Sequence, residues 1–308
     1  MLEKTLITRR SYGFAYLLLK FKILSIFESA SETIMRTLVI SFFLLAVLSS
    51  TAQTGPGGVG SSATNQLWLM ANTGVYTDGG STDAANTNNI QQWNDQSGNG
   101  RNAIQLTLGN RPNYQTGVMN GLPVIRFTNA NNDRMLSAGL TSANAASVWV
   151  VASYTSLPSP NPGLIQGSPS GLAYTSADKN IGMWVASTSP FRAWGRGIQT
   201  DGTSVNLSNT TGTPTTAGTV YLYLNQYNGT NAITQYLSGS VSSTVPYNGT
   251  LRSWTDMAIG NQSGTEGWNG DIAEVIAYNT SVNSAQRIII DNYLAAKYGL
   301  TGASKHRQ

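Results

Sequence analysis

The chain has 308 residues, no cysteine and one histidine, and only 10% of its residues are charged. Its formal charge of +4 comes mostly from the first 52 residues, because the rest of the chain carries 12 basic and 11 acidic side chains. The near-balanced charge argues against a basic nucleic-acid surface, and the absence of cysteine excludes a disulfide framework and a Cys–His catalytic site. The one histidine, His306, lies near the end of the chain, which argues against a Ser–His–Asp catalytic site and a histidine-ligated zinc site.

The first 52 residues predict an export signal. An arginine precedes an apolar run, Leu38–Leu48, and small residues before Gln53 supply a cleavage site. The run is too short for a membrane span, so we expect none in the mature chain. We interpret residues 35–52 as a signal peptide and residues 1–34 as a mis-assigned N-terminal extension, with a long anchored leader as the alternative. Either interpretation predicts a secreted or cell-surface protein.

Residues 53–64 are rich in Gly, Ser and Pro and predict a linker. Beyond them, short β-rich segments alternate with Gly and Asn clusters, which supply the left-handed positions of tight turns. Short strands at this spacing are typical of an antiparallel sandwich or barrel. The predicted strands are Gln66–Met70, Pro123–Phe127, Ser147–Tyr154, Gly163–Gln166, Ile181–Val185, Val220–Tyr227, Ala232–Leu237, Met257–Ile259 and Asp271–Tyr278.

The last segment predicts the one helix of the domain. Asn283 and the glutamine three residues later can form a capping box. Apolar residues then follow a helical period, and Gly299 can end the helix in the left-handed conformation. Asn228-Gly229 predicts a hairpin turn between two strands. We therefore expect one domain, residues 65–300, followed by a tail, residues 301–308.

Five segments spread over the domain together resemble a known group of modules. They are Leu67-Trp68-Leu69, Gln92–Ala103, Asn120–Phe127, Trp268–Asn279 and the end of the predicted helix, Tyr293–Leu300. The domain is similar to the LamG-like jelly-roll modules of the concanavalin A-like lectin/glucanase superfamily, which are common in secreted bacterial proteins. The resemblance implies an all-β fold in which two antiparallel sheets form a jelly-roll β-sandwich. It also implies a binding or adhesive role, often toward glycans and sometimes with Ca²⁺, but this fold hosts lectins, hydrolases and structural modules alike.

A tight loop is predicted after Trp93, the second tryptophan of the domain. Asp95 and Ser97 can bond nearby backbone N–H groups, and Gly98 and Gly100 allow left-handed turns. Such a loop either binds a ligand or metal, or holds Trp93 in the core. Turn chemistry alone explains every residue type here, so the structural interpretation is favoured.

The segment at 271–278 is apolar on both faces and predicts a central strand. Strand alternation places Ile272 and Glu274 on one face and Asp271 on the other. A partly buried Glu274 needs a partner, for which Arg126 is the candidate. We favour a structural ion pair over a carboxylate that orients a ligand. Because Asp271 and Glu274 are expected on opposite faces, they do not form the carboxylate pair of a glycosidase.

Two oxygen-rich loops, residues 78–89 and 129–133, are candidate calcium sites. Ca²⁺ is held by six to eight oxygens from Asp, Asn and backbone carbonyls. Loops of this kind are more often simply solvated, and the spacing of an EF-hand is absent. No cofactor is therefore certain, and calcium is the one candidate. Its candidate ligands are Asp78, Asp83, Asp95 and Asp133.

Tryptophan side chains are the other candidate binding groups, because sugars stack on aromatic rings. Trp68, Trp93 and Trp149 lie in strand-like segments and are predicted in the core. The remaining four are nearer to turns. Among them Trp194, between Arg192 and Arg196, is the candidate for an exposed ligand-binding ring, and packing at the sandwich edge is the alternative.

Three functions remain after these exclusions. The first is a secreted, non-catalytic module that binds carbohydrate or serves in adhesion. The second is a structural module of a cell-surface protein, which binds protein or no ligand. The third is a glycoside hydrolase of the concanavalin A-like fold, which needs two carboxylates facing one cleft. The sequence favours the first, with carbohydrate or a cell-surface protein as partner and no catalytic residues.

Overall fold

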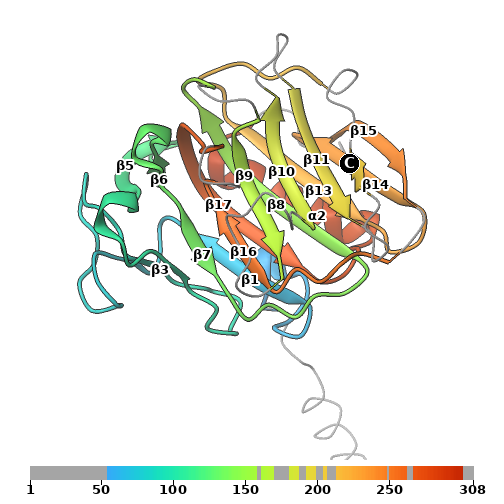
Figure 1. Cartoon of the computed structure of the whole chain (residues 1–308), viewed down its shortest axis with the longest axis horizontal. Helices are drawn as coiled ribbons and strands as arrows, with labels where there is room; N and C mark the ends of the chain where they lie inside the picture. Colours follow the sequence, from blue (N-terminus) through green and yellow to red (C-terminus); the bar gives the residue numbers. More distant parts are fainter. Residues whose placement is uncertain are drawn as a thin grey trace, which may run out of the picture. The chain divides into compact units, whose positions relative to one another are not determined.

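The chain folds into two antiparallel β-sheets that pack face to face (Figure 1). The computed structural model describes residues 54–157, 161–169, 180–186, 213–247, 250–261 and 266–300, and the backbone of residues 192–198 and 204–206. The predicted N-terminal extension, signal peptide and C-terminal tail lie outside these residues. The prediction of an all-β, two-sheet antiparallel sandwich with one C-terminal helix is confirmed.

Sheet A has eight strands in the order β15-β14-β13-β8-β17-β6-β5, with β1 also paired to β17. Its strands are β1 (Asn65–Met70), β5 (Asn113–Met119), β6 (Leu122–Phe127), β8 (Ala146–Tyr154), β13 (Tyr221–Tyr227), β14 (Ala232–Leu237), β15 (Ser240–Pro246) and β17 (Gly270–Tyr278).

Sheet B has nine strands in the order β12-β11-β10-β9-β16-β7-β4-β3-β2. Its strands are β2 (Val75–Tyr76), β3 (Gln92–Trp93), β4 (Ala103–Ile104), β7 (Met135–Ser137), β9 (Gly163–Ser168), β10 (Ile181–Ala186), β11 (Arg192–Ile198), β12 (Ser204–Asn206) and β16 (Asp256–Ile259). Short 3-10 turns lie at η1 (Pro56–Gly58), η2 (Leu108–Asn110) and η3 (Asn129–Asn131).

All nine strands predicted from the sequence are present, with ends that differ by at most two residues. The predicted turn at Asn228-Gly229 joins β13 to β14 in an antiparallel hairpin. Eight strands were not predicted. Strands β2, β3, β4, β7 and β12 have two or three residues, which are too few to show an alternating pattern. Strands β5, β11 and β15 have seven residues each and were missed as well.

The space between the sheets holds the main hydrophobic core, to which alternate residues of both sheets contribute. Trp93, Trp254 and Trp268 lie in this core with at most 1% of their surface exposed. Trp93 is therefore in the core as predicted, whereas Trp254 and Trp268, which the sequence placed nearer to turns, are core residues as well.

Helix α2 (Ser284–Tyr298) covers the outer face of sheet A (Figure 1). Ile290 and Leu294 of the helix pack with Trp149 of β8 in a second apolar cluster. The predicted capping box at Asn283 is confirmed, and Gly299 ends the helix with φ 65°. No helix in the described part of the chain is long and apolar enough to cross a membrane. In sheet B, the strands β9, β10 and β16 are buried at every residue, whereas β4 and β7 carry exposed or half-buried side chains.

The segment predicted as a linker is packed against the domain. Pro56 and Val59 are buried, and Tyr278 donates a hydrogen bond of 2.7 Å to the carbonyl of Val59. The turn η1 also contacts α2, where Gly57 lies against Ile289. The linker prediction is therefore wrong for residues 55–59, because Pro56 and Val59 within this Gly-rich segment pack against the domain.

Candidate functional site

An open groove lies on the outer face of sheet B, over β4 and β7. The strand register pairs Ile104 with Leu136, while their neighbours Ala103 and Met135 point into the core between the sheets. Alternation along a strand therefore turns Ile104 and Leu136 away from the core, toward solvent. Ile104 is 39% exposed, and Leu136 is half-buried.

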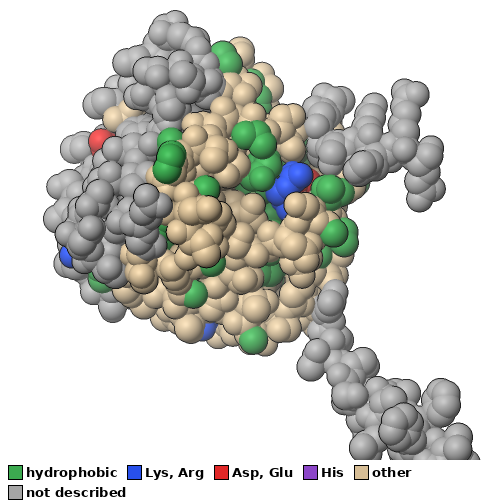
Figure 2. Space-filling view, turned by 90° about the vertical axis from the view of Figure 1, so that its right-hand side faces the viewer, with side chains coloured by type: hydrophobic (Ala, Val, Ile, Leu, Met, Phe, Trp, Pro, Cys, Tyr) green, Lys and Arg blue, Asp and Glu red, His purple; other side chains and the backbone are tan. Residues whose placement is uncertain are grey.

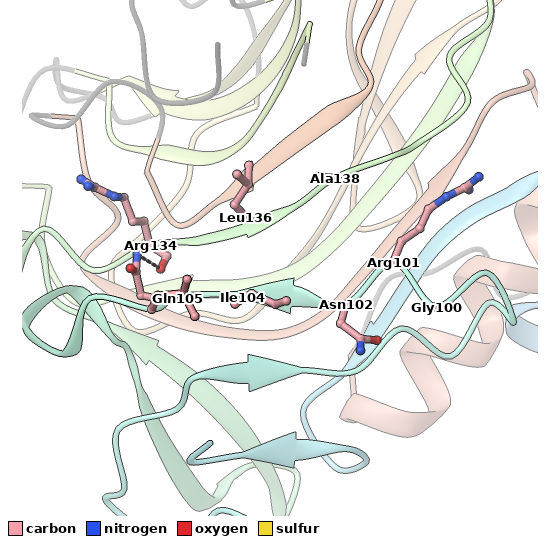
Figure 3. Close-up of a pocket in the computed structure, with 9 residues that line it drawn as sticks. Gly100, Arg101, Asn102, Ile104, Gln105, Arg134, Leu136 and Ala138 are labelled. Carbon is pink, nitrogen blue, oxygen red and sulfur yellow. Dashed lines mark hydrogen bonds between the residues drawn. The ribbon is translucent and has the colours of Figure 1, made fainter. Parts of the chain in front are cut away.

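The groove has a volume of about 560 Å³, which lies within the range typical of ligand sites. Aliphatic side chains form its floor, and amide and guanidinium groups flank them (Figure 3). In Figure 3, Arg101 and Arg134 lie at opposite ends, with Ile104 and Leu136 between them. The residues that line it are Gly100, Arg101, Asn102, Ile104, Gln105, Leu106, Arg134, Leu136 and Ala138.

Hydrogen bonds hold the chain beyond β4 at the edge of the groove. Arg111 donates to the carbonyls of Gln105 and Leu106 at 3.0 and 3.2 Å, and to Thr77 at 3.2 Å. Gln105 donates in turn to the carbonyl of Arg134 at 3.1 Å. These bonds hold Leu106 in a position where it is 73% exposed. An apolar side chain held out in solvent in this way is available for contact with a ligand.

Arg101 connects the groove to the start of β1. Its Nη1 donates to the carbonyl oxygen of Gln66 at 3.0 Å and to the Gln66 side-chain oxygen, and its Nη2 donates to Thr141 at 3.3 Å. Burial lowers the pKa of Arg101, and the charge of Asp95 acts in the opposite direction. All three acceptors are neutral, and no carboxylate of the described residues bonds this guanidinium.

The loop at Asp95 is held together by that side chain. Asp95 Oδ1 accepts from the backbone N–H groups of Trp68 and Ser97 at 2.9 Å, and Oδ2 accepts from the Ser97 hydroxyl at 2.7 Å and from the N–H of Arg101 at 3.1 Å. Gly98 and Gly100 have φ of 88° and 69°. This geometry fits the favoured structural role, and the loop brings Arg101 to one end of the groove (Figure 3).

Two of the four candidate calcium ligands lie in the turn after β2. Asp78 accepts hydrogen bonds from the N–H groups of Gly80, Ser81 and Thr82 and from the Thr82 hydroxyl, at 2.7 to 3.1 Å. These bonds, with those from Ser81 and Thr82 the strongest, lower the pKa of Asp78 to about 2. Asp83 is exposed and bridges by its backbone to Tyr76. Asp78 therefore orders its own turn.

The four candidate calcium ligands are not brought together. No group of three or more His, Cys, Asp or Glu side chains that could hold a metal occurs in the described part of the chain. The candidate residues Asp78 and Asp95 use their carboxylates for hydrogen bonds within their own loops. Calcium binding at these residues stays an untested prediction with no shared geometry behind it.

Asp133, the fourth candidate, is buried after the turn η3. It is 2% exposed, its Oδ2 accepts from the N–H of Thr128 at 2.8 Å, and its Oδ1 has no hydrogen-bond partner. Burial raises its pKa to about 6, which the bond from Thr128 opposes. A buried carboxylate that lacks a second partner is costly to ionise.

We expect this carboxylate to make stability fall as the pH rises from 4 to 6. A folded-state pKa of about 6 against an ordinary 3.8 means that the folded state binds the proton more tightly. The stabilisation is complete below the unfolded pKa and is lost as the pH passes through the folded one. Asp133→Asn should remove about 2 kcal/mol of this pH dependence, measured by urea unfolding of both proteins across this range. Equal slopes for the two proteins would contradict the assignment.

The predicted pair of Arg126 with Glu274 is wrong. Arg126 instead holds Asp271 through two bonds of 2.7 and 2.9 Å. The register of β17 shifts between Ile272 and Glu274 at a β-bulge, which places Ile272 in the core and Glu274 on the outer face. An extra residue at a bulge reverses the alternation beyond it. Asp271 and Glu274 therefore share the outer face of sheet A, contrary to the prediction of opposite faces.

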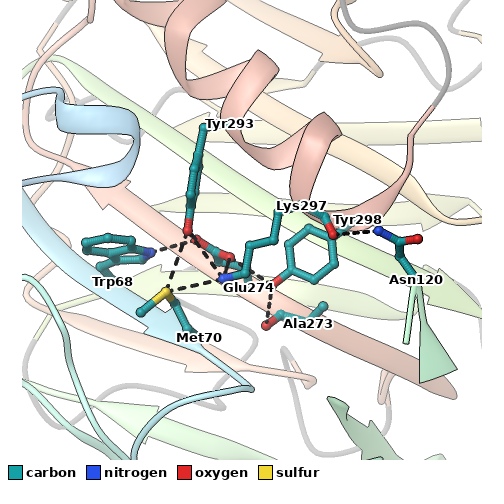
Figure 4. Close-up of polar contacts among 8 residues, drawn as sticks. All are labelled: Trp68, Met70, Asn120, Ala273, Glu274, Tyr293, Lys297 and Tyr298. Carbon is teal, nitrogen blue, oxygen red and sulfur yellow. Dashed lines mark hydrogen bonds and ion pairs between the residues drawn. The ribbon is translucent and has the colours of Figure 1, made fainter. Parts of the chain in front are cut away.

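Glu274 lies under helix α2 and accepts four hydrogen bonds (Figure 4). Trp68 Nε1 and the Tyr293 hydroxyl donate to Oε1 at 2.6 and 3.1 Å, and Lys297 Nζ and the Tyr298 hydroxyl donate to Oε2 at 2.7 and 2.8 Å. Burial, together with the charge of Glu274, raises the pKa of both tyrosines. This buried polar cluster attaches the helix to sheet A, in keeping with the favoured structural role of Glu274.

Tryptophan positions differ in part from the sequence expectations. Trp149 and Trp184 are buried to 0 and 1% exposure, while Trp68 is half-buried and packs edge-on against Tyr293. The backbone of β11 pairs with β10, and it contains the predicted ligand-binding residues. The side chains of Arg192, Trp194 and Arg196 lie outside the described residues, so that prediction stays untested.

The groove itself was missed by the sequence analysis. Ile104, Leu106 and Leu108 alternate with polar residues, a pattern that predicts an inward-facing apolar row. In the structure they are instead 39%, 73% and 63% exposed. Figure 2 shows one face of the molecule, on which other side chains and the backbone (tan) predominate, hydrophobic side chains are scattered and few charged side chains appear.

No protein-family model and no curated protein matches the chain. Among solved structures, a GH54 α-L-arabinofuranosidase soaked with a cyclic sulfate inhibitor aligns at 14% identity and a TM-score of 0.50, over 80% of this chain and 62% of that one. The binding domain of Paraclostridial Mosquitocidal Protein 1 aligns at 10% identity and 0.49, over 76% and 53%. Domain 4 of AbnA, an extracellular arabinanase from Geobacillus stearothermophilus, aligns at 13% identity and 0.42, over 74% and 97%. At these identities the chain is similar to such proteins in its β-sandwich fold alone.

Proposed function

We propose that this protein is an exported, non-catalytic module that binds carbohydrate in the groove on the outer face of sheet B. The observation that carries the proposal is the groove itself, about 560 Å³, with an aliphatic floor between amide and guanidinium groups. The resemblance of the sequence to LamG-like modules of the concanavalin A-like superfamily agrees with such a role. The apolar leader before Gln53 supports export.

The groove offers both kinds of contact that a sugar needs. The C–H faces of a sugar ring can pack on Ile104 and Leu136, and its hydroxyls can bond to Asn102, Gln105 and the arginines. The sequence predicted an aromatic binding surface, but none of the nine lining residues is aromatic. Packing against aliphatic side chains alone favours modest affinity for a single ring, and a chain of several sugars would use the length of the groove.

The acidic residues of β17 and α2 support a binding role over a hydrolase. A glycosidase needs two carboxylates that face one sugar. Although Asp271 and Glu274 share a face, Arg126 pairs with the first, and α2 covers the second. Asp291 of the helix pairs with Arg287 at 2.6 Å. None of the nine residues that line the groove is acidic.

A charge placed on the groove floor is expected to weaken carbohydrate binding strongly. Ile104→Asp adds a desolvation cost and removes the apolar contact, so we expect at least a tenfold loss of affinity, about 1.4 kcal/mol. Because Ile104 is already 39% exposed, the fold should tolerate the change. Affinity electrophoresis and calorimetry against a panel of plant, algal and bacterial polysaccharides would measure the effect.

The matched control is Val241→Asp on β15 of sheet A, a residue that is 58% exposed and does not line the groove. It should bind as the unmodified protein does. If the unmodified protein binds no polysaccharide of the panel, the structural-module alternative is favoured. If both variants lose binding equally, the ligand does not lie in the groove.

A further inference from the structure

The charges that line the groove are all of one sign. Arg101 and Arg134 lie at its two ends, and no Asp or Glu is among the nine lining residues (Figure 3). The nearby carboxylates are already committed or buried. Asp95 accepts four hydrogen bonds within its loop, and Asp133 is 2% exposed. A ligand in the groove therefore meets two positive charges and no exposed negative one among the lining residues.

The guanidinium of Arg101 retains donors for a ligand. An arginine has five N–H donors, and Arg101 uses both donors of Nη1 on Gln66 and one of Nη2 on Thr141. Its Nε–H and the second N–H of Nη2 have no acceptor within the described part of the chain. The contacts to Gln66 and Thr141 hold the group in place, which lowers the entropic cost of using those donors.

The same protein shows what these two nitrogens can bind. Arg126 uses its Nε and Nη2 to hold the carboxylate of Asp271 at 2.7 and 2.9 Å. Paired N–H donors of a guanidinium match the two oxygens of a planar carboxylate. In Arg101 the corresponding nitrogens belong to a residue that lines the groove.

We propose that the ligand of the groove is a carboxylate-bearing polysaccharide, such as a chain of uronic acids, and that Arg101 binds its carboxylate while Ile104 and Leu136 contact the sugar rings. Arg134, at the far end, lines the groove as its second positively charged side chain. This inference rests on the proposed carbohydrate-binding function and specifies its ligand class.

The test compares polygalacturonate with the same polymer after chemical reduction of its carboxyl groups to alcohols. The full mature chain, residues 53–308, is titrated with each by calorimetry. We expect binding to the acidic polymer to be at least tenfold tighter than to the reduced one, and to weaken as salt is added, because screening reduces charge attraction. Dextran sulfate forms a third arm, which separates carboxylate from sulfate recognition.

Variants locate the effect. Arg101→Gln should weaken binding to polygalacturonate about tenfold, and should weaken binding to the reduced polymer by much less, because only the acidic polymer loses a charged partner. Arg101→Lys keeps the charge but loses the paired donors, so it should recover only part of that affinity. Arg134→Gln should cause a smaller loss, and Arg252→Gln, which does not line the groove, none. Thermal unfolding of each variant tests whether the fold is kept. If one variant at position 101 is unstable, the other variant at that position and Arg134→Gln still test whether the arginines contribute to binding of the acidic polymer.

The outcomes separate the two proposals. Equal binding of the acidic and the reduced polymer would overturn the carboxylate inference and leave the carbohydrate-binding function standing. Preference for dextran sulfate would likewise overturn the inference. Absence of binding to any polymer would remove both.

Discussion

Replacing Glu274 with alanine is expected to lower the free energy of unfolding by about 3–5 kcal/mol, because it removes one partner of a buried ion pair. Glu274 is 1% exposed and accepts bonds from four side chains, among them Lys297 at 2.7 Å. Without the carboxylate, the ammonium of Lys297 is left with Met70 Sδ at 3.3 Å and the Tyr293 hydroxyl at 3.3 Å as neighbours. Neither compensates a positive charge that is largely buried.

Urea unfolding followed by tryptophan fluorescence measures this loss. The control is Asp83→Ala, which removes an exposed carboxylate and should change stability by no more than about 0.5 kcal/mol. In a double-mutant cycle, Glu274→Ala combined with Lys297→Met should cost less than the sum of the two single changes, because no unpaired charge remains. A loss below about 1 kcal/mol for Glu274→Ala, or strict additivity in the cycle, would show that the cluster does not attach the helix.

The second large effect is expected at Gly260, just after β16. Its φ is 77°, and a Cβ at this position would overlap the buried ring of Phe127, with Cγ at 2.8 Å. Gly260→Ala therefore combines a left-handed backbone with overpacking of the core, and we expect a loss of about 3 kcal/mol. Equilibrium unfolding in urea gives the value.

Gly139 supplies a control with the same backbone conformation. Its φ is also 77°, but a Cβ there would meet no atom within 4 Å. Gly139→Ala should therefore cost only the backbone part, about 1 kcal/mol. The difference between the two variants isolates the contact with Phe127, and equal losses would mean that the core moves aside at no cost.

The candidate site was less accessible to sequence reasoning than the fold. The row Ile104, Leu106, Leu108 carries the alternating pattern of a buried strand, yet β4 has only two residues and the chain then leaves the sheet. Arg111 fixes that departure through bonds to Gln105 and to Thr77, which lies 34 residues earlier. Partners so far apart in the chain are not visible in a local pattern.

The pairing of charged residues shows the same limit. The sequence predicted a partner for Glu274 on β6, but a single bulge in β17 changed which residues share a face. As a result, Asp271 forms an ion pair with Arg126, and Glu274 pairs with Lys297 of a helix that begins ten residues later in the sequence. A bulge depends on how neighbouring strands align, so one strand's own sequence does not specify it.

The sequence by itself determined nine of the strands and the capped helix of this protein, because local apolar patterns and the residue types at Asn283 and Gly299 act within single segments. Tertiary structure alone decided that Ile104 and Leu136 lie side by side facing solvent, and that Arg101 and Arg134 flank them. The physical reason is that register and bulges arise from the packing of segments far apart in the chain.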